Sequence, residues 1–170
     1  MGIDTIEPFM KVAERDGKGV VVLARTSNPG SADFQAKLIA DERGGGEPLY
    51  LHVARALAPM ISRLRSPTVG WSGLMMVAGA TGPAEAVKLR AAASDALFLV
   101  PGYGAQGAGA RESMAGFVQG PKGLEGGVVS ASRSVSFPKD ANEARLARDW
   151  EAAIDRAITA ARTEVLAAAC

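Results

Sequence analysis

Residues 97–107 read LFLVPGYGAQG, a short apolar run that passes directly into a glycine-rich turn. A second pair of this kind follows, because the residues GVV at 127–129 lead into SASRS at 130–134. Glycine lets a backbone approach a ligand closely, and the forked cation of Arg133 matches the geometry of a phosphate group. Two such turns after successive strands predict one phosphate-binding site that both turns share, as is found after the last two strands of a (β/α)8 barrel.

The remaining sequence alternates between strand-like and helical segments. The near-continuous apolar run at 19–24 predicts a parallel strand that is covered on both faces. Further strands are predicted at 71–78, 97–100 and 128–129. Helices are predicted at 4–15, 83–93, 111–118 and 142–168, and residues 32–64 are predicted to be mostly helical with a break at 44–46. Asp4 is the expected N-cap of the first helix, with Glu7 completing a capping box. This alternation predicts an α/β fold with a parallel sheet.

The composition limits the class of protein. The 170 residues suffice for one domain, but a complete (β/α)8 barrel usually needs about 250. A net charge of +1 argues against binding to nucleic acid or to a membrane surface. Cys170 is the single cysteine, so no intrachain disulfide forms, and no apolar run reaches the roughly 18 residues of a membrane span. No signal peptide and no cysteine or histidine spacing typical of a metal site is found, so we expect a cytoplasmic protein without a metal.

Four strand–helix units are half of an eight-stranded barrel. An isolated half leaves two sheet edges unpaired and one apolar sheet face uncovered. We therefore expect residues 1–170 to form a single unit that either pairs with a second copy or is part of a longer protein.

Three segments, in order along the chain, resemble the bacterial orotidine 5′-phosphate decarboxylases, and most closely their longer type 2 subfamily. Residues 25–35 (RTSNPGSADFQ) resemble the segment after strand five of that family, 101–107 its strand-seven turn, and 132–134 its strand-eight turn. The resemblance implies a TIM (β/α)8 barrel of which this chain covers about strands 5–8, as its C-terminal portion, with the N-terminal half missing. It also implies decarboxylation of orotidine 5′-phosphate to uridine 5′-phosphate in pyrimidine biosynthesis, without a cofactor, by a cytoplasmic homodimer.

The same resemblance implies roles for individual residues. Ser27 matches a serine that bonds the pyrimidine edge, Gln106 a glutamine that reaches the substrate phosphate, and Arg133 an arginine that binds this phosphate. The resemblance also implies phosphate contacts from the backbone of Gly107, Ser132 and Ser134. It implies that the side chains of Pro101 and Tyr103 line the pocket.

One part of the family pattern is absent. The family carries out its chemistry with an Asp-x-Lys-x-x-Asp cluster. In this chain Asp16-Gly17-Lys18 is the nearest match, but Val21 stands three residues after Lys18, where the motif requires an aspartate. These three residues are better explained as a turn that ends a helix. We therefore assign no catalytic residue to this chain, and expect it to bind the substrate while lacking the residues for proton transfer. The alternative is a non-catalytic half-barrel that binds a phosphate ligand and associates with itself.

Individual residues also have structural explanations. Arg133 would then pair with a helix carboxylate, Gln106 would bond loop carbonyls, and Ser27 would stabilise its own turn. Residues 102–107 satisfy the bare Gly-x-Gly-x-x-Gly pattern of dinucleotide sites, but no acidic partner for a ribose follows at the expected distance. We expect His52 and Cys170 to have no chemical role.

Overall fold

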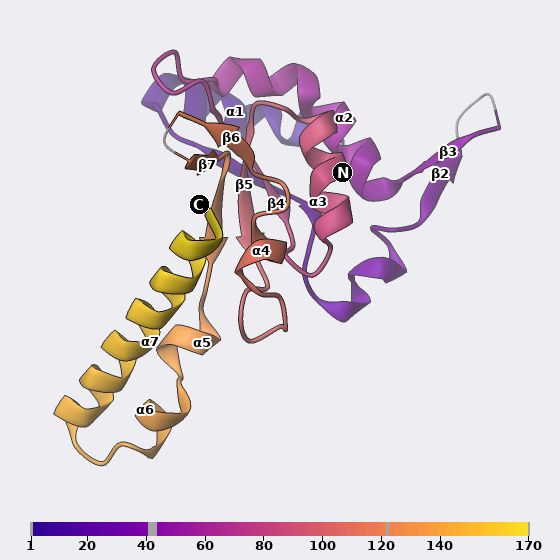
Figure 1. Cartoon of the computed structure of the whole chain (residues 1–170). Helices are drawn as coiled ribbons and strands as arrows, with labels where there is room; N and C mark the ends of the chain where they lie inside the picture. The colour runs from indigo at the N-terminus through magenta and orange to yellow at the C-terminus, as the bar shows by residue number, and fades with distance from the viewer. Residues whose placement is uncertain (1, 41–43, 122, 170) are drawn as a thin grey trace.

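A four-stranded parallel sheet forms the centre of the computed structural model, which describes residues 2–40, 44–121 and 123–169. Its strands are β1 (Val20–Arg25), β4 (Ser72–Ala78), β5 (Ala96–Pro101) and β8 (Gly127–Ser130), in the order β1-β4-β5-β8 (Figure 1). Every neighbouring pair in this sheet is parallel, which confirms the predicted α/β class. The prediction for Cys170 lies outside the described residues.

Three helices cover one face of the sheet: α1 (Glu7–Asp16), α2 (Leu49–Ile61) and α3 (Pro83–Ala92). The core between these two layers includes Met10, Leu57 and Leu89 from the helices, packed with Met76 and Phe98 from the sheet. Every second residue of β5 is buried, as expected for a strand with one covered face. The expectation that the strand at 19–24 is covered on both faces is wrong, because Val21 and Leu23 of β1 are 49% and 64% exposed.

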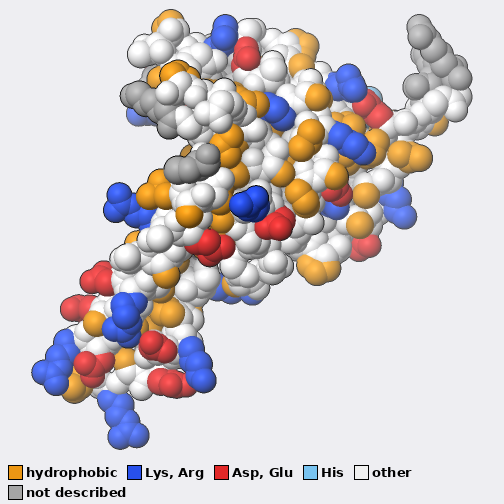
Figure 2. Space-filling view, viewed as in Figure 1, with side chains coloured by type: hydrophobic (Ala, Val, Ile, Leu, Met, Phe, Trp, Pro, Cys, Tyr) orange, Lys and Arg blue, Asp and Glu red, His pale blue; other side chains and the backbone are white. Residues whose placement is uncertain are grey.

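The remaining elements lie around this layer. Two hairpins pair β2 (Leu38–Ala40) with β3 (Gly46–Pro48) and β6 (Val118–Gly120) with β7 (Gly123–Glu125). Short helical segments are η1 (Ile3–Thr5), η2 (Pro29–Asp33), η3 (Ser62–Leu64), α4 (Ala110–Ser113), α5 (Arg133–Ser136) and α6 (Lys139–Glu143). The long helix α7 (Ala147–Ala169) runs with α5 and α6 in an arm that projects away from the sheet (Figure 1). Figure 2 shows charged side chains of both signs gathered on this arm.

The segment before α2 differs from the prediction. Residues 38–40 and 46–48 form an antiparallel hairpin, not a short helix. The backbone N–H of Leu49 donates to the carbonyl of Lys37 (2.8 Å), and that of Tyr50 donates to the carbonyl of Gln35 (3.0 Å). These bonds tie the start of α2 to the chain before the hairpin. Pairing between these segments, and not local helix propensity, therefore determines the conformation of residues 38–48.

Two helix starts were also placed wrongly. Asp4 lies in η1, and α1 begins at Glu7 with Pro8 in its first turn and no side-chain cap from Ile6. The closing helix begins at Ala147 rather than at residue 142, after the two separate short helices of the arm. The end of α1 agrees with the prediction, because Gly17 adopts a left-handed conformation with φ of 62° and stops the helix.

Candidate functional site

Ser27 lies in the turn after β1, at the carboxyl end of the sheet. Its neighbours fix this turn: the backbone N–H of Thr26 donates to Oε1 of Gln35 (2.8 Å), and the hydroxyl of Thr81 donates to the carbonyl of Ser27 (3.0 Å). Within the described part of the chain the Ser27 hydroxyl itself has no hydrogen-bond partner. The turn therefore does not depend on that hydroxyl, which leaves it available to a ligand.

Ser27 and Gln106 lie in the same cleft. This cleft has a volume of ≈ 420 Å³, and its other lining residues are Arg25, Asn28, Pro29, Ser31, Thr81 and Ala105. Gln106 is exposed in the turn after β5, and its amide bonds no loop carbonyl among the described residues. The structure thus brings together two of the residues that the sequence singled out, from turns about eighty positions apart.

The turns after β1, β5 and β8 pack directly against one another. A Cβ atom placed on Gly102 would lie 2.8 Å from the Cβ of Ser27, and one on Gly104 would lie 2.9 Å from Oγ of Ser134. Both glycines also have a positive φ, of 109° and 71°, which larger residues rarely adopt. Only glycine allows this approach, so the predicted glycine-rich turn is what brings the three turns into contact.

Arg133 begins α5, next to this point of contact. Its side chain is exposed and forms no ion pair or hydrogen bond with any residue that the structure describes. The predicted alternative of a helix carboxylate partner is therefore not what the structure shows. Arg133 lies outside the cleft of Ser27 and Gln106, but its neighbour Ser134 has a buried hydroxyl that lacks a hydrogen-bond partner among the described residues.

The backbone groups differ in their availability. The N–H of Gly107 donates to the carbonyl of Gly104 (2.8 Å) inside its own turn. In this structure that group closes the turn, and a phosphate contact from the Gly107 backbone stays a prediction. The N–H groups of Ser132 and Ser134 bond no carbonyl within the described residues.

Tyr103 and Pro101 do not line the cleft in the described part of the chain. Tyr103 is buried with Ala110 and Met114, and its hydroxyl donates to Oε2 of Glu164 (2.6 Å) on α7. Pro101 ends β5, and its carbonyl accepts a bond from the N–H of Ala80 (2.8 Å). Tyr103 therefore connects the turn after β5 to the projecting arm.

We expect Tyr103→Phe to lower the free energy of unfolding by about 1 kcal/mol at neutral pH, because a hydrogen bond to a carboxylate is lost. Burial and the bond to Glu164 raise the pKa of Tyr103 to about 12, from 10.0. The unfolded state therefore loses this proton first, so the contribution of Tyr103 is complete below about pH 10 and disappears toward pH 12. Urea denaturation of both proteins checks this, since a difference that stays constant through this pH range would contradict it.

Two residues that the sequence did not single out as site residues lie in the same cleft. The guanidinium of Arg25 donates to Oγ of Ser31 and to Oε1 of Glu85 (3.4 Å), which ties the end of β1 to η2 and α3. Thr81 follows β4 and holds Ser27 as described above. Their positions directly at strand ends are a signal that could have identified them, since binding residues of parallel sheets gather there.

Other kinds of site are not present among the described residues. They include no group of three or more histidine, cysteine, aspartate or glutamate side chains that could hold a metal ion. None of their helices is long and apolar enough to cross a membrane. His52 is exposed, with its Nδ1 at 3.7 Å from Oε1 of Glu47.

The sequence and the structure are similar to those of known proteins. The orotidine 5′-phosphate decarboxylase of Rhodopirellula baltica is 35% identical over 98% of this chain and 53% of that protein. The one of Methylibium petroleiphilum is 38% identical over 95% of this chain and 55% of that protein. The solved structure of Leishmania donovani OMP decarboxylase matches with a TM-score of 0.61 and 30% identity, over 98% of this chain and 54% of that one. The chain thus spans about half the length of the curated relatives it matches.

The profile of one protein family matches most of the chain, from residue 1 to residue 145. Its solved members are TIM barrels, and the four parallel strands described above correspond to part of such a barrel. The chain belongs to the orotidine 5′-phosphate decarboxylase / HUMPS family.

Proposed function

We propose that this chain supplies the pyrimidine- and phosphate-binding half of an orotidine 5′-phosphate decarboxylase, which forms uridine 5′-phosphate in pyrimidine biosynthesis. The observation that carries the proposal is that the turns after β1, β5 and β8 meet at the carboxyl end of the sheet. Ser27 lies against Gly102 there, and Gly104 lies against Ser134. A ligand with a ring at one end and a phosphate at the other needs polar groups from several strands at this edge.

Each polar group has a specific task in this proposal. The Ser27 hydroxyl bonds the pyrimidine edge, and the amide of Gln106, in the same cleft, reaches toward the phosphate. Arg133 neutralises the phosphate charge, and the free N–H groups of Ser132 and Ser134 add hydrogen bonds to its oxygens. The buried hydroxyl of Ser134 gains the partner that it lacks among the described residues.

Binding and chemistry are divided between two parts of the barrel. Contacts to the remote phosphate provide binding energy that positions the ring and lowers the barrier of the reaction. The family resemblance assigns proton transfer to an Asp-x-Lys-x-x-Asp cluster, which this sequence does not contain. The proposed enzyme therefore needs the other half of the barrel, and we place the complete protein in the cytoplasm as a homodimer.

Binding of uridine 5′-phosphate and of uridine tests the proposal. The isotope-labelled chain is mixed with the part of the Rhodopirellula baltica enzyme that lies outside the matched region, and amide NMR signals are followed during titration. We expect the nucleotide to shift the signals of Gly104, Ser132 and Ser134, and uridine to leave them unchanged. Equal effects of the two ligands, or no shift by the nucleotide, would contradict a phosphate site at these turns.

A further inference from the structure

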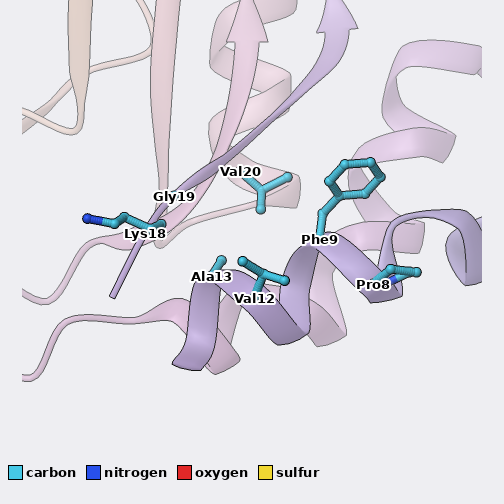
Figure 3. A pocket seen from close by; sticks show the side chains of 7 residues that line it. All are labelled: Pro8, Phe9, Val12, Ala13, Lys18, Gly19 and Val20. Atoms are coloured by element: carbon cyan, nitrogen blue, oxygen red, sulfur yellow. The ribbon is translucent and has the colours of Figure 1, made fainter. Parts of the chain in front are cut away.

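The two ends of β1 carry different kinds of side chain. At the start of the strand, a hollow of ≈ 340 Å³ lies between α1 and β1 and is lined mainly by apolar residues. Figure 3 shows Phe9 and Val12 of α1 there, with Lys18 shortly before the strand. At the carboxyl end the strand finishes with Arg25, which lines the cleft of the candidate site. A charged group at this end therefore lies beside the residues that bind a ligand.

The position of Arg25 departs from the regular alternation of β1. Val21 and Leu23 are exposed on the uncovered face of the sheet, and strict alternation would place Arg25 on that face as well. The register with β4 shifts, however. Leu23 lies opposite Val77, and Arg25, two residues later, lies opposite Ala78, only one residue later. A bulge of this kind changes the direction of a side chain at the end of a strand.

The guanidinium of Arg25 closes the turn that carries Ser27. It donates to Oγ of Ser31 on η2, six residues further along the chain. It also donates to Oε1 of Glu85 (3.4 Å), which belongs to α3 on the helix-covered side of the sheet. Glu85 thus holds the guanidinium against the helix layer, and the guanidinium holds the far end of the turn.

Further bonds fix the residues beside Ser27 without using its hydroxyl. The backbone N–H of Thr26 donates to Oε1 of Gln35 (2.8 Å), and the hydroxyl of Thr26 donates to Oδ1 of Asn28 (2.7 Å). The Ser27 hydroxyl has no hydrogen-bond partner in the part of the chain that the structure describes. A rigid turn with a free hydroxyl at its centre is what a preorganised binding group requires.

Arg25 is not placed to bind a ligand itself. Its side chain is only 12% exposed, and its two Nη atoms already bond Ser31 and Glu85. Its Nε atom is buried and has no hydrogen-bond partner among the described residues. Burying a donor without a partner costs free energy, so folding stability alone does not account for an arginine at this position.

We infer that Arg25 is a positioning residue for the substrate: held by Glu85, it fixes the turn that presents the Ser27 hydroxyl to the pyrimidine ring. The inference rests on the proposed function and concerns a residue to which that function assigns no task. In the proposed function the turns after β5 and β8 bind the phosphate, so Arg25 acts on the ring end of the ligand only. Loss of Arg25 therefore weakens the binding of a ligand that carries the ring and not of one that lacks it.

Binding of uridine 5′-phosphate and of ribose 5-phosphate tests the inference, with this chain mixed with the other half of the Rhodopirellula baltica enzyme. We expect Arg25→Met and Ser31→Ala each to weaken nucleotide binding about three- to tenfold, the effect of one hydrogen bond, and to leave ribose 5-phosphate binding unchanged. In a chain that carries Ser27→Ala, neither change should have a further effect, because both act through the lost hydroxyl. Lys18→Met is the matched control, since Lys18 is an exposed cation at the opposite end of β1.

Hydrogen exchange of the Thr26 amide tests the rigidity of the turn without a ligand. We expect Arg25→Met and Ser31→Ala to speed this exchange by roughly tenfold or more. The amide of Phe98, which bonds the carbonyl of Gly126 in the sheet, should change much less. A general loss of stability would instead speed both amides alike. Circular dichroism confirms that each variant is folded, and Ser31→Ala decides alone if Arg25→Met is not.

The outcomes separate this inference from the proposed function. Unchanged nucleotide binding, equal losses for the two ligands, a loss that adds in full to that of Ser27→Ala, or an equal effect of Lys18→Met would overturn the inference. Unchanged exchange of the Thr26 amide would also overturn it. If the unaltered mixture binds neither ligand, the proposed function fails, and faster exchange of Thr26 in the variants still supports the hold of Arg25 on its turn.

Discussion

Replacing Arg90 with methionine is expected to remove about 3–5 kcal/mol of folding stability, the cost of breaking a buried charged network. The guanidinium is only 8% exposed and donates to five backbone carbonyls. These belong to Ala93, Ser94, Ala96, Gly116 and Gly126, with distances from 2.6 to 3.3 Å. One side chain thereby joins the end of α3, the start of β5, the segment after α4 and the start of β8.

Aromatic rings hold the same guanidinium in place. Its central carbon lies 3.9 Å from the ring centre of Phe98 and 5.0 Å from that of Trp71. Burial lowers the pKa of Arg90 to about 10. This value is still well above 7, so Arg90 remains cationic at neutral pH.

Methionine fills much of the same space but donates no hydrogen bond, so all five carbonyls lose the bond from Arg90. The carbonyls of Ala93 and Gly126 keep a bond from the backbone N–H of Ala96 and of Phe98. The loss therefore falls mainly on the other three.

Urea denaturation followed by circular dichroism measures this loss. Arg15→Met is the control, because Arg15 is exposed and bonds only its neighbour Asp16, so we expect a change below about 1 kcal/mol. A small domain is stable by about 5–15 kcal/mol, so the loss at Arg90 leaves the chain close to unfolding. A loss at Arg90 no larger than the one at Arg15 would show that the carbonyl network contributes little.

Arg133→Ala is expected to weaken the binding of uridine 5′-phosphate by roughly 10- to 100-fold, since hydrogen bonds to charged groups contribute about 1.5–3 kcal/mol. The affinity for uridine should remain unchanged, because uridine has no phosphate for Arg133 to bind. Arg133 is exposed and without a partner among the described residues, so its removal leaves no buried group unsatisfied. The folding stability should therefore stay within about 0.5 kcal/mol of the original.

Calorimetric titration measures the affinities for uridine 5′-phosphate and for uridine, with this chain mixed with the other half of the Rhodopirellula baltica enzyme. Lys139→Ala is the matched control, because Lys139 is an exposed cation that begins the next helix, α6. If Lys139→Ala weakens nucleotide binding as much as Arg133→Ala does, the effect is one of general charge and not of a phosphate contact. If Arg133→Ala weakens uridine and the nucleotide equally, its role is structural.

The sheet could be predicted from the sequence because its signals are local. The four apolar runs, and the glycine that ends α1, depend on the residues themselves. The hairpin before α2 could not be predicted, since Leu49 and Tyr50 bond carbonyls on the far side of it. The network of Arg90 was equally hidden, because its acceptors are backbone carbonyls as far away as Gly126.

The candidate site could be predicted only in part. Ser27 and Gln106 follow strands, and parallel strands bring the residues after them to one edge, where the structure shows both in one cleft. Tyr103 occupies a similar position in the sequence, but its side chain turns toward Glu164 on α7, a contact across sixty residues. The open sheet face and free edges agree with the expectation for a half-barrel, because Leu23 and Val128 remain exposed.

Turnover of orotidine 5′-phosphate is the most direct test of the division between binding and chemistry. The measurement compares this chain alone, the complementary half of the Rhodopirellula baltica enzyme alone, and the mixture of both, by following the loss of substrate. We predict turnover by the mixture only, and its decrease when the added chain carries Arg133→Ala. Turnover by this chain alone, or a mixture that forms a complex and binds the nucleotide but leaves the substrate unchanged, would contradict the account.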